Sequence, residues 1–154
     1  MAITYYGAYG ANLNKEEMQV RCPAAKPIES LLLVDWTLVF KGVADMIPDA
    51  GSAILIGIYE ITETCERALD HYEGYPWLYK KHYLNVALSR GPTQIMIYVM
   101  QDHYEFGKPA SKYFQIIDQG YDDWEFDHAL LNTALRHSIK NDRGDSYKSP
   151  RWED

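Results

Sequence analysis

The sequence contains little cysteine and no long hydrophobic run. Its 154 residues include two cysteines, Cys22 and Cys65, which do not form a CxxC pair. The N-terminus lacks the charged and then apolar pattern of a secretory leader, so we expect a cytoplasmic protein whose thiols are reduced. No apolar run approaches the roughly 18 residues that a membrane-spanning helix needs, and we therefore expect no membrane partner.

The signatures of several well-known enzyme classes are also missing. The sequence contains no GxSxG, no GxxxxGK[ST] and no HExxH. The two glycines of the segment YGAYG, residues 6–10, do not make up the three-glycine pattern of a dinucleotide-binding fingerprint. The five histidines have no metal-ligand spacing, whereas a zinc site needs three or four convergent ligands. We therefore expect neither a metal nor another cofactor.

Composition favours a single globular domain that contains a polar site. The formal net charge of −7 argues against nucleic acid or an anionic membrane as the partner. Hydrophobic residues make up 47% of the chain and charged residues 24%, so disorder is not expected. Tyrosine occurs thirteen times against four phenylalanines. Because tyrosine joins an aromatic ring to a hydroxyl that needs a partner, we expect several tyrosines to line something polar.

Strand patterns occupy the first two thirds of the chain, and helical patterns interrupt and follow them. The expected strands are a tyrosine-rich one at Tyr5, two within residues 31–49 that end in a Pro-Asp-Ala-Gly turn, and others at residues 53–62, 79–88 and 93–100. The expected helices are a short one from Asn12 or Asn14 that stops at Pro23, one within residues 63–75, one from Ser111, and one over residues 126–139.

The order of these elements predicts the α+β class. Strands and helices do not alternate as in a doubly wound fold, and few charges protect the strand edges. We therefore expect a small mixed β-barrel of five to seven strands with surrounding α-helices. Residues 1–139 are assigned to this domain, and the polar residues 140–154, which contain proline and glycine, are expected to form a loosely held tail.

The segment YYGAYGANLN, residues 5–14, predicts a strand that ends in a tight turn. Gly7 and Gly10 allow positive φ and a close approach of backbone that other residues resist. Such a turn can be ordinary punctuation between elements. It can also expose backbone N–H groups as a nest for a ligand's oxygens.

One carboxylate lies in an unusual setting. In the segment LDHYEGYPWLY, residues 69–79, Glu73 follows a helical pattern and is flanked by aromatic residues. A solvated glutamate beside glycine is the ordinary interpretation. Aromatic surroundings can, however, desolvate a carboxyl and raise its pKa toward neutrality, so that it both takes and returns a proton.

Together these segments resemble the γ-glutamylcyclotransferase-like, or AIG2-like, family. The resemblance rests on YGANLN, RCP, DWTLVFKGVADMIPDAGS, GIYEIT, ALDHYEGYPWLYKKHYLNV and PASKY, in this order, and covers roughly residues 4–135. It implies a small mixed β-barrel with helices around it. It also implies an enzyme that cyclises the glutamyl part of a γ-glutamyl amide to 5-oxoproline and releases an amine, without a metal.

The resemblance also implies roles for individual residues. Glu73 matches the catalytic acid and base. The positions that match substrate-binding residues are Tyr9, Gly10, Ala11, Asn12 and Leu13 in the amide-bearing loop, and Tyr79 and Tyr113 in the pocket wall. Many members have serine where this chain has Ala11. That change matters only if the hydroxyl, and not the N–H alone, contacts the substrate.

Alternatives to a general cyclotransferase remain at this point. The chain could be a non-catalytic small-molecule-binding module of the same fold, for which Ala11 is the only support and against which Glu73 argues. It could also be a pathway-specific member that removes a γ-glutamyl group from a dedicated metabolite. In each case the expected partner is a small molecule, and the chain is expected to be a monomer or a homodimer.

Overall fold

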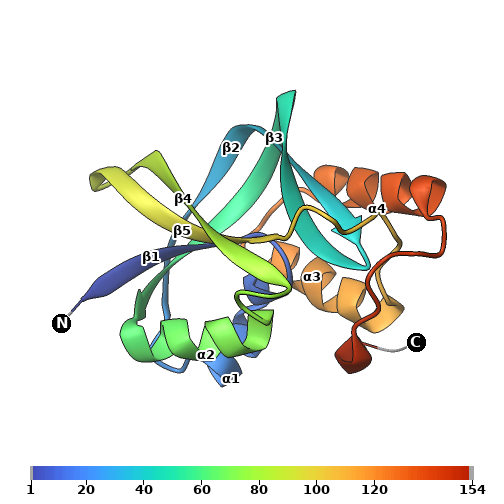
Figure 1. The fold of residues 1–154 in the computed structure, drawn as a ribbon. Helices are drawn as coiled ribbons and strands as arrows, with labels where there is room; N and C mark the ends of the chain where they lie inside the picture. The colour runs from blue at the N-terminus through green and yellow to red at the C-terminus, as the bar shows by residue number, and fades with distance from the viewer. Residues whose placement is uncertain (1, 153–154) are drawn as a thin grey trace.

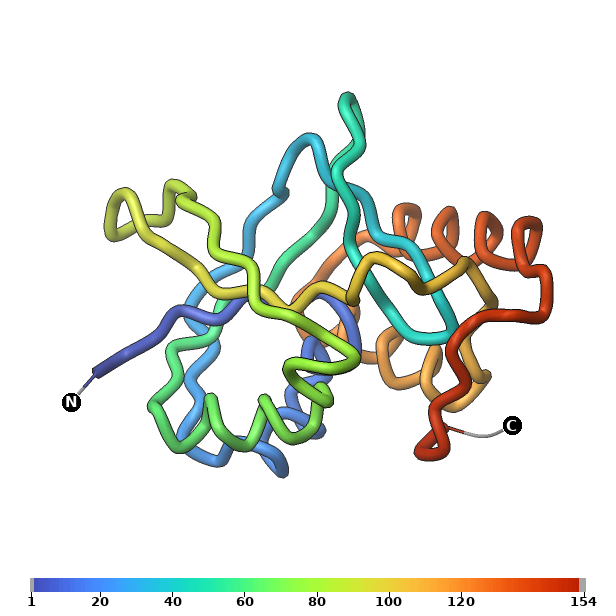
Figure 2. Tube along the Cα trace, in the orientation of Figure 1, coloured from blue at the N-terminus to red at the C-terminus, as the bar shows by residue number. Residues whose placement is uncertain are grey.

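The computed structural model describes residues 2–152, in which helices surround one mixed sheet (Figures 1 and 2). The strands are β1 (Ile3–Ala8), β2 (Lys26–Lys41), β3 (Val43–Thr62), β4 (Tyr79–Leu88) and β5 (Gly91–Met100). The helical elements are η1 (Ala11–Leu13), α1 (Lys15–Arg21), α2 (Glu63–Glu73), α3 (Ser111–Asp123), α4 (Ala129–Asn141) and η2 (Pro150–Trp152), of which η1 and η2 are single 3-10 turns. The predicted α+β class is confirmed.

The sheet has the strand order β2-β3-β1-β5-β4 and is barrel-like, although backbone hydrogen bonds do not close it. Strand β1 is antiparallel to β3 and parallel to β5, so the sheet is mixed as predicted. Within the described chain the edge strands β2 and β4 share no ladder, but the rings of Trp36 and His82 lie 5.4 Å apart across them. The N–H of Ser89, just after β4, donates to the Glu29 carboxylate of β2 at 2.9 Å. Side-chain contacts therefore bridge the two edges.

The β2–β3 hairpin turns at Gly42 and not at the Pro-Asp-Ala-Gly segment. Gly42 has φ = 82°, a left-handed conformation that favours glycine, and the two strands pair up to it. Residues 49–52 form an excursion inside β3, because Pro48 pairs with Trp36 and pairing with β2 resumes at Ala53. The Gly51 N–H donates to Asp35 Oδ1 at 3.0 Å and holds this excursion against β2. The prediction that this turn ends a strand was wrong, since a neighbouring strand keeps the ladder intact on both sides.

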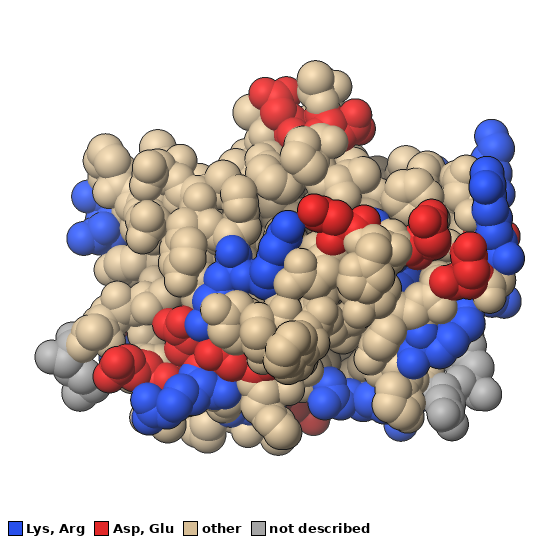
Figure 3. Space-filling view, in the orientation of Figure 1, with Lys and Arg blue, Asp and Glu red and all other residues tan. Residues whose placement is uncertain are grey.

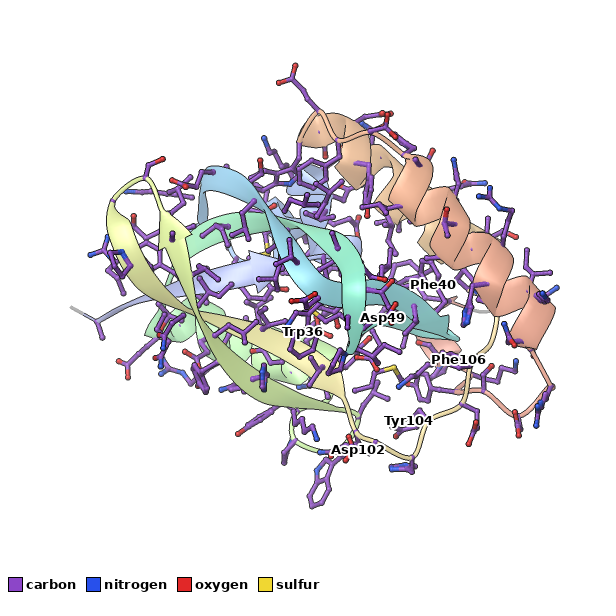
Figure 4. All side chains as sticks on the ribbon, turned by 90° about the horizontal axis from the view of Figure 1, so that it is seen from above. Trp36, Phe40, Asp49, Asp102, Tyr104 and Phe106 are labelled. Atoms are coloured by element: carbon purple, nitrogen blue, oxygen red, sulfur yellow. The ribbon has the colours of Figure 1, made fainter. Side chains whose placement is uncertain are left out.

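The connection from β5 to α3 lies against the tip of this hairpin. The N–H of Gly107 donates to the Phe40 carbonyl at 3.1 Å, and the N–H of Gly42 donates to the Gly107 carbonyl at 2.9 Å. Figure 4 shows Tyr104 and Phe106 on this connection near the end of β2 that carries Phe40. The hairpin tip and the connection thus form one backbone-bonded surface.

Helix α2 has defined signals at both ends, and these fix the position of Glu73. The Thr62 hydroxyl accepts a hydrogen bond from the Cys65 N–H at 3.3 Å, as an N-cap does. Gly74 adopts φ = 64° and ends the helix directly after Glu73. The buried side chains Cys65 and Leu69 hold one face of α2 in the core. The predicted helix is confirmed, and its last residue is the candidate catalytic carboxylate.

Helix α3 packs directly on η1. A Cβ on Gly120 would lie 2.7 Å from the Asn14 backbone nitrogen and 2.8 Å from Leu13, so only glycine permits this approach. The Trp124 indole N–H donates to the Leu13 carbonyl at 2.8 Å. Helix α4 contacts β2 beside the end of the β2–β3 hairpin (Figure 1). The loop after β1 is therefore held from behind by α3.

The centre of the core is formed by β3 and β5, which carry the fully buried residues Ile54, Ile56, Ile58, Ile61 and Ile95. On the face in Figure 3, Lys and Arg alternate with Asp and Glu and do not gather into one basic surface. None of the helices in residues 2–152 has the length and apolar character that crossing a membrane requires.

Residues 142–152 follow α4 and run back past α3 (Figure 2). Ser146 is buried, and Tyr147 and Trp152 pack against the core. The boundary at residue 139 stays a prediction. These three residues thus contact the domain, while most of the other described residues of the segment are exposed; the loosely held tail stays a prediction as well.

Candidate active site

The loop after β1 leaves backbone N–H groups without helical partners. Gly10 begins the turn η1, in which the N–H groups of Leu13 and Asn14 donate to Gly10 and Ala11 at 3.0 and 3.1 Å. The amides of Ala11 and Asn12 precede these bonds, and the first N–H groups of a helical turn have no acceptor within it. A Cβ on Gly10 would lie 3.1 Å from the Ala44 side chain, so glycine allows the loop to lie close to β3.

Asn12 connects this loop to Glu73. Its side chain is buried, and its Nδ2 donates to the Tyr6 hydroxyl at 2.9 Å and to Glu73 Oε1 at 3.3 Å. The Tyr59 hydroxyl donates to the Asn12 carbonyl at 2.8 Å and fixes the backbone. The Oδ1 atom of Asn12 is buried and has no hydrogen-bond partner among the described residues. A buried acceptor without a partner is costly, which is consistent with a polar ligand at this position.

Glu73 has the most informative electrostatics of the site. Its carboxyl is half-buried at the end of α2. Burial, which penalises the charged form, raises its pKa from 4.5 to about 7, against the opposing charges of Arg21 and Arg151. A carboxyl with this pKa exchanges a proton readily near neutral pH.

Tyrosine hydroxyls frame the site and are occupied by hydrogen bonds. The Tyr113 hydroxyl accepts from the Ala44 N–H at 2.9 Å, while the Tyr79 hydroxyl donates to the Ala44 carbonyl. The Tyr9 hydroxyl donates to the Tyr98 carbonyl at 2.6 Å. Burial raises the pKa of Tyr9, Tyr79 and Tyr113 well above 10, so these hydroxyls stay protonated. They hold β3 and β5 at fixed positions around the cavity.

These groups surround one cavity of about 230 Å³. Six of the seven residues proposed to bind substrate line it, as does Glu73. The lining residues from the core and from α2 are Tyr6, Tyr9, Gly10, Ala11, Asn12, Val43, Ala44, His71, Tyr72, Glu73, Gly74, Leu78, Tyr79, Tyr98 and Tyr113. Leu13 does not line it, because its side chain is fully buried and its N–H donates to Gly10.

The sequence did not identify every residue of the cavity. Tyr6 and Tyr98 lie on neighbouring strands with their rings 5.9 Å apart, and only strand pairing could reveal that both face the site. Ser149, Pro150, Arg151 and Trp152 come from the C-terminal segment. Trp152 and Arg151 are an aromatic and a cation in a polar stretch, which is a weak signal without the fold.

Two arginines lie over Tyr72. The guanidinium of Arg21 is 3.6 Å and that of Arg151 is 4.3 Å from the ring centroid. Arg21 is paired with Glu17 at 3.1 Å. The positive charges of both arginines lower the pKa of Glu73 and partly offset the increase that burial causes.

The arrangement can bind a small polar molecule and move one proton. The N–H groups of Ala11 and Asn12 can donate hydrogen bonds to an oxygen that gains negative charge, and Glu73 can act as acid or base beside them. Within residues 2–152, no three His, Cys, Asp or Glu side chains converge in a way that could hold a metal ion.

Comparisons with solved structures show the fold. A structure described as gamma-glutamyl cyclotransferase matches with TM-score 0.73 and 22% identity, over 97% of this chain and 95% of that chain. An uncharacterised protein from Homo sapiens matches with TM-score 0.72 and 22% identity, over 98% and 96%. YkqA from Bacillus subtilis matches with TM-score 0.72 and 20% identity, over 94% of this chain and 57% of that one.

Sequence comparison shows the family. No curated protein sequence is significantly similar to the chain. The family model described as "Gamma-glutamyl cyclotransferase, AIG2-like" matches residues 6–125, which is more than half of the chain and includes the loop after β1, Glu73, Tyr79 and Tyr113. The chain therefore belongs to the AIG2-like gamma-glutamyl cyclotransferase family.

Proposed function

We propose that this protein cleaves a γ-glutamyl amide through attack of the substrate's own α-amine, releasing 5-oxoproline and a free amine. The observation that carries the proposal is the contact between Glu73 and Asn12, at 3.3 Å, within one cavity. It joins a carboxyl whose pKa is about 7 to a loop in which the N–H groups of Ala11 and Asn12 precede the first hydrogen bond of η1. Family membership supports the reaction class.

The nucleophile belongs to the substrate. The α-amine is tethered to the γ-carbonyl that it attacks, and such tethering can replace up to roughly 7–11 kcal/mol of the barrier. The protein therefore needs no nucleophilic side chain. Its task is to hold the γ-glutamyl group folded, with the amine close to the carbonyl carbon.

Glu73 performs both proton transfers. As a carboxylate it takes a proton from the α-ammonium, so that the nitrogen can form its bond to the γ-carbon. The tetrahedral oxyanion then accepts hydrogen bonds from the N–H groups of Ala11 and Asn12. When the intermediate collapses, the amide C–N bond breaks and the protonated Glu73 gives its proton to the leaving nitrogen. The ring nitrogen, which still carries one proton too many, loses it through the Glu73 carboxylate to the released amine, so that a lactam N–H and an ammonium result. The carboxylate is regenerated at the end of the cycle.

Ala11 is compatible with this role because the mechanism uses its N–H and not its side chain. Its backbone N–H precedes the first hydrogen bond of η1. A serine hydroxyl at this position is therefore not required for oxyanion stabilisation.

The test compares a γ-glutamyl amide with its N-acetylated form. We expect the free amine and 5-oxoproline to appear in equal amounts from the first compound, measured by chromatography. The acetylated compound should not react, because the lone pair of its amide nitrogen is delocalised. Release of free glutamate, or turnover of the acetylated compound, would mean that water is the nucleophile and that the proposed reaction is wrong.

A further inference from the structure

The C-terminal segment, residues 142–152, is anchored on the hairpin tip and the β5–α3 connection. The Asp142 carboxylate accepts hydrogen bonds from the N–H groups of Lys108 and Gly144 at 3.0 and 2.8 Å. A Cβ on Gly42 would collide with the Tyr147 carbonyl oxygen, and one on Gly107 would collide with the Ser146 side chain. Two glycines thus accept the backbone and side chains of this segment at close range.

The anchored segment brings two side chains to the cavity. The Trp152 ring lies 5.3 Å from the ring of Tyr113. Arg151 donates from Nη1 to the Tyr72 carbonyl at 3.3 Å, and its guanidinium lies 4.3 Å from the Tyr72 ring centroid. These contacts hold the guanidinium at the cavity.

Arg151 has hydrogen-bonding capacity left over. Arg21, on the same ring, forms an ion pair with Glu17, whereas among the described residues no carboxylate lies within ion-pair distance of Arg151. A guanidinium has five N–H donors, and only Nη1 of Arg151 donates to a protein acceptor within residues 2–152. The remaining donors can form a bidentate contact with a carboxylate.

Exposure indicates which part of a substrate Arg151 meets. Asn12, at the inner end of the cavity, is only 3% exposed, and Glu73 beside it is half-buried. Arg151 is exposed, so it lies toward the mouth. The γ-glutamyl group must reach Glu73, so the amine half of the substrate extends toward the mouth.

We propose that Arg151 determines substrate specificity by binding a carboxylate on the amine half, so that the preferred substrates are γ-glutamyl amides whose released amine carries a carboxylate. The proposal rests on the proposed function. The family model ends at residue 125, so this wall of the cavity comes from a part of the chain outside the family match. The residue that selects the substrate is therefore distinct from the groups that carry out the reaction.

The test uses two substrates that differ by one charge, γ-glutamylglycine and γ-glutamylglycinamide. Wild-type protein should have a kcat/KM for 5-oxoproline release that is at least about tenfold higher for γ-glutamylglycine than for γ-glutamylglycinamide. The reason is that a hydrogen bond between charged groups is stronger than a neutral one by an amount that corresponds to about a tenfold change in binding. Arg151→Gln should remove this ratio, and Arg151→Lys should restore part of it. Loss of the Arg151 charge near Glu73 changes the turnover of both substrates alike, so it does not affect the ratio.

The matched control is Arg143→Gln. Arg143 lies in the same segment, is exposed and does not line the cavity. This variant changes the net charge equally and should keep the wild-type ratio. Thermal melting of each variant checks that the fold is retained.

Each outcome has a defined meaning. A wild-type ratio near one, or an equal fall for both substrates in Arg151→Gln, would overturn the proposal. If neither compound yields 5-oxoproline, the proposed function fails, and calorimetric dissociation constants for the same pair then decide the role of Arg151. Tighter binding of the acid that is lost in Arg151→Gln supports it, and equal binding of both compounds overturns it.

Discussion

Replacing Glu73 with glutamine should abolish turnover and, above neutral pH, stabilise the fold. Glutamine keeps the size of the side chain and an oxygen that can accept from Asn12, which donates to Glu73 at 3.3 Å. Glutamine cannot take a proton from the substrate's α-ammonium and pass it to the leaving amine. General acid–base catalysis typically raises the reaction rate by roughly 10²–10⁴-fold. The kcat of the variant should therefore fall by about a hundredfold or more.

The stability effect follows from the raised pKa. Burial raises the pKa of Glu73 from 4.5 to about 7 in the folded state, so the folded protein binds more protons than the unfolded chain between these values. The free energy of unfolding contributed by Glu73 is therefore largest below pH 4.5 and is lost as the pH rises through 7. At 1.36 kcal/mol per pKa unit, the loss amounts to about 3 kcal/mol. Glutamine has no charge to bury and avoids this loss.

The assay is urea denaturation of wild type and Glu73→Gln at several pH values between 4 and 9, followed by tryptophan fluorescence. The difference in unfolding free energy should grow by up to about 3 kcal/mol in favour of the variant as the pH rises. The control is Glu63→Gln, at the exposed first turn of the same helix, which should give no such trend. Parallel pH profiles for Glu73→Gln and wild type, or a kcat above a tenth of the wild-type value, would refute the reasoning.

Two further substitutions test the frame of the site. Asp45→Ala should lower the free energy of unfolding by about 3–5 kcal/mol in urea denaturation. The buried Lys41 lies 2.8 Å from the Asp45 carboxylate and would lose its counter-charge. A loss below about 1 kcal/mol would contradict this. Gly42→Ala should release the C-terminal segment and speed hydrogen exchange there, because its Cβ would collide with the Tyr147 carbonyl. Gly51→Ala is the control, with a similar positive φ of 86° but open space around it, and equal exchange in both variants would refute the collision.

Local signals were sufficient for several elements. The Thr62 cap and Gly74 define α2 within the chain itself, because capping bonds and the left-handed C-terminal residue involve only near neighbours. The same applies to the β4–β5 hairpin, since strands were expected at residues 79–88 and 93–100 and the two strands pair up to Leu88 and Gly91. The Pro-Asp-Ala-Gly turn failed as a signal because the ladder to β2 lies outside the window in which turn chemistry acts.

The sequence by itself determined the fold class, the end of α2 at Glu73 and the glycine-bearing loop after β1, since each depends on residues close together in the chain. Only the tertiary structure brought Asn12 to within 3.3 Å of Glu73 across 61 residues, and the burial that results raises the pKa of the carboxyl to about 7. Only the tertiary structure also brought Arg151 to the cavity. Desolvation and long-range charge depend on which distant segments exclude water from a group, and no local pattern encodes them.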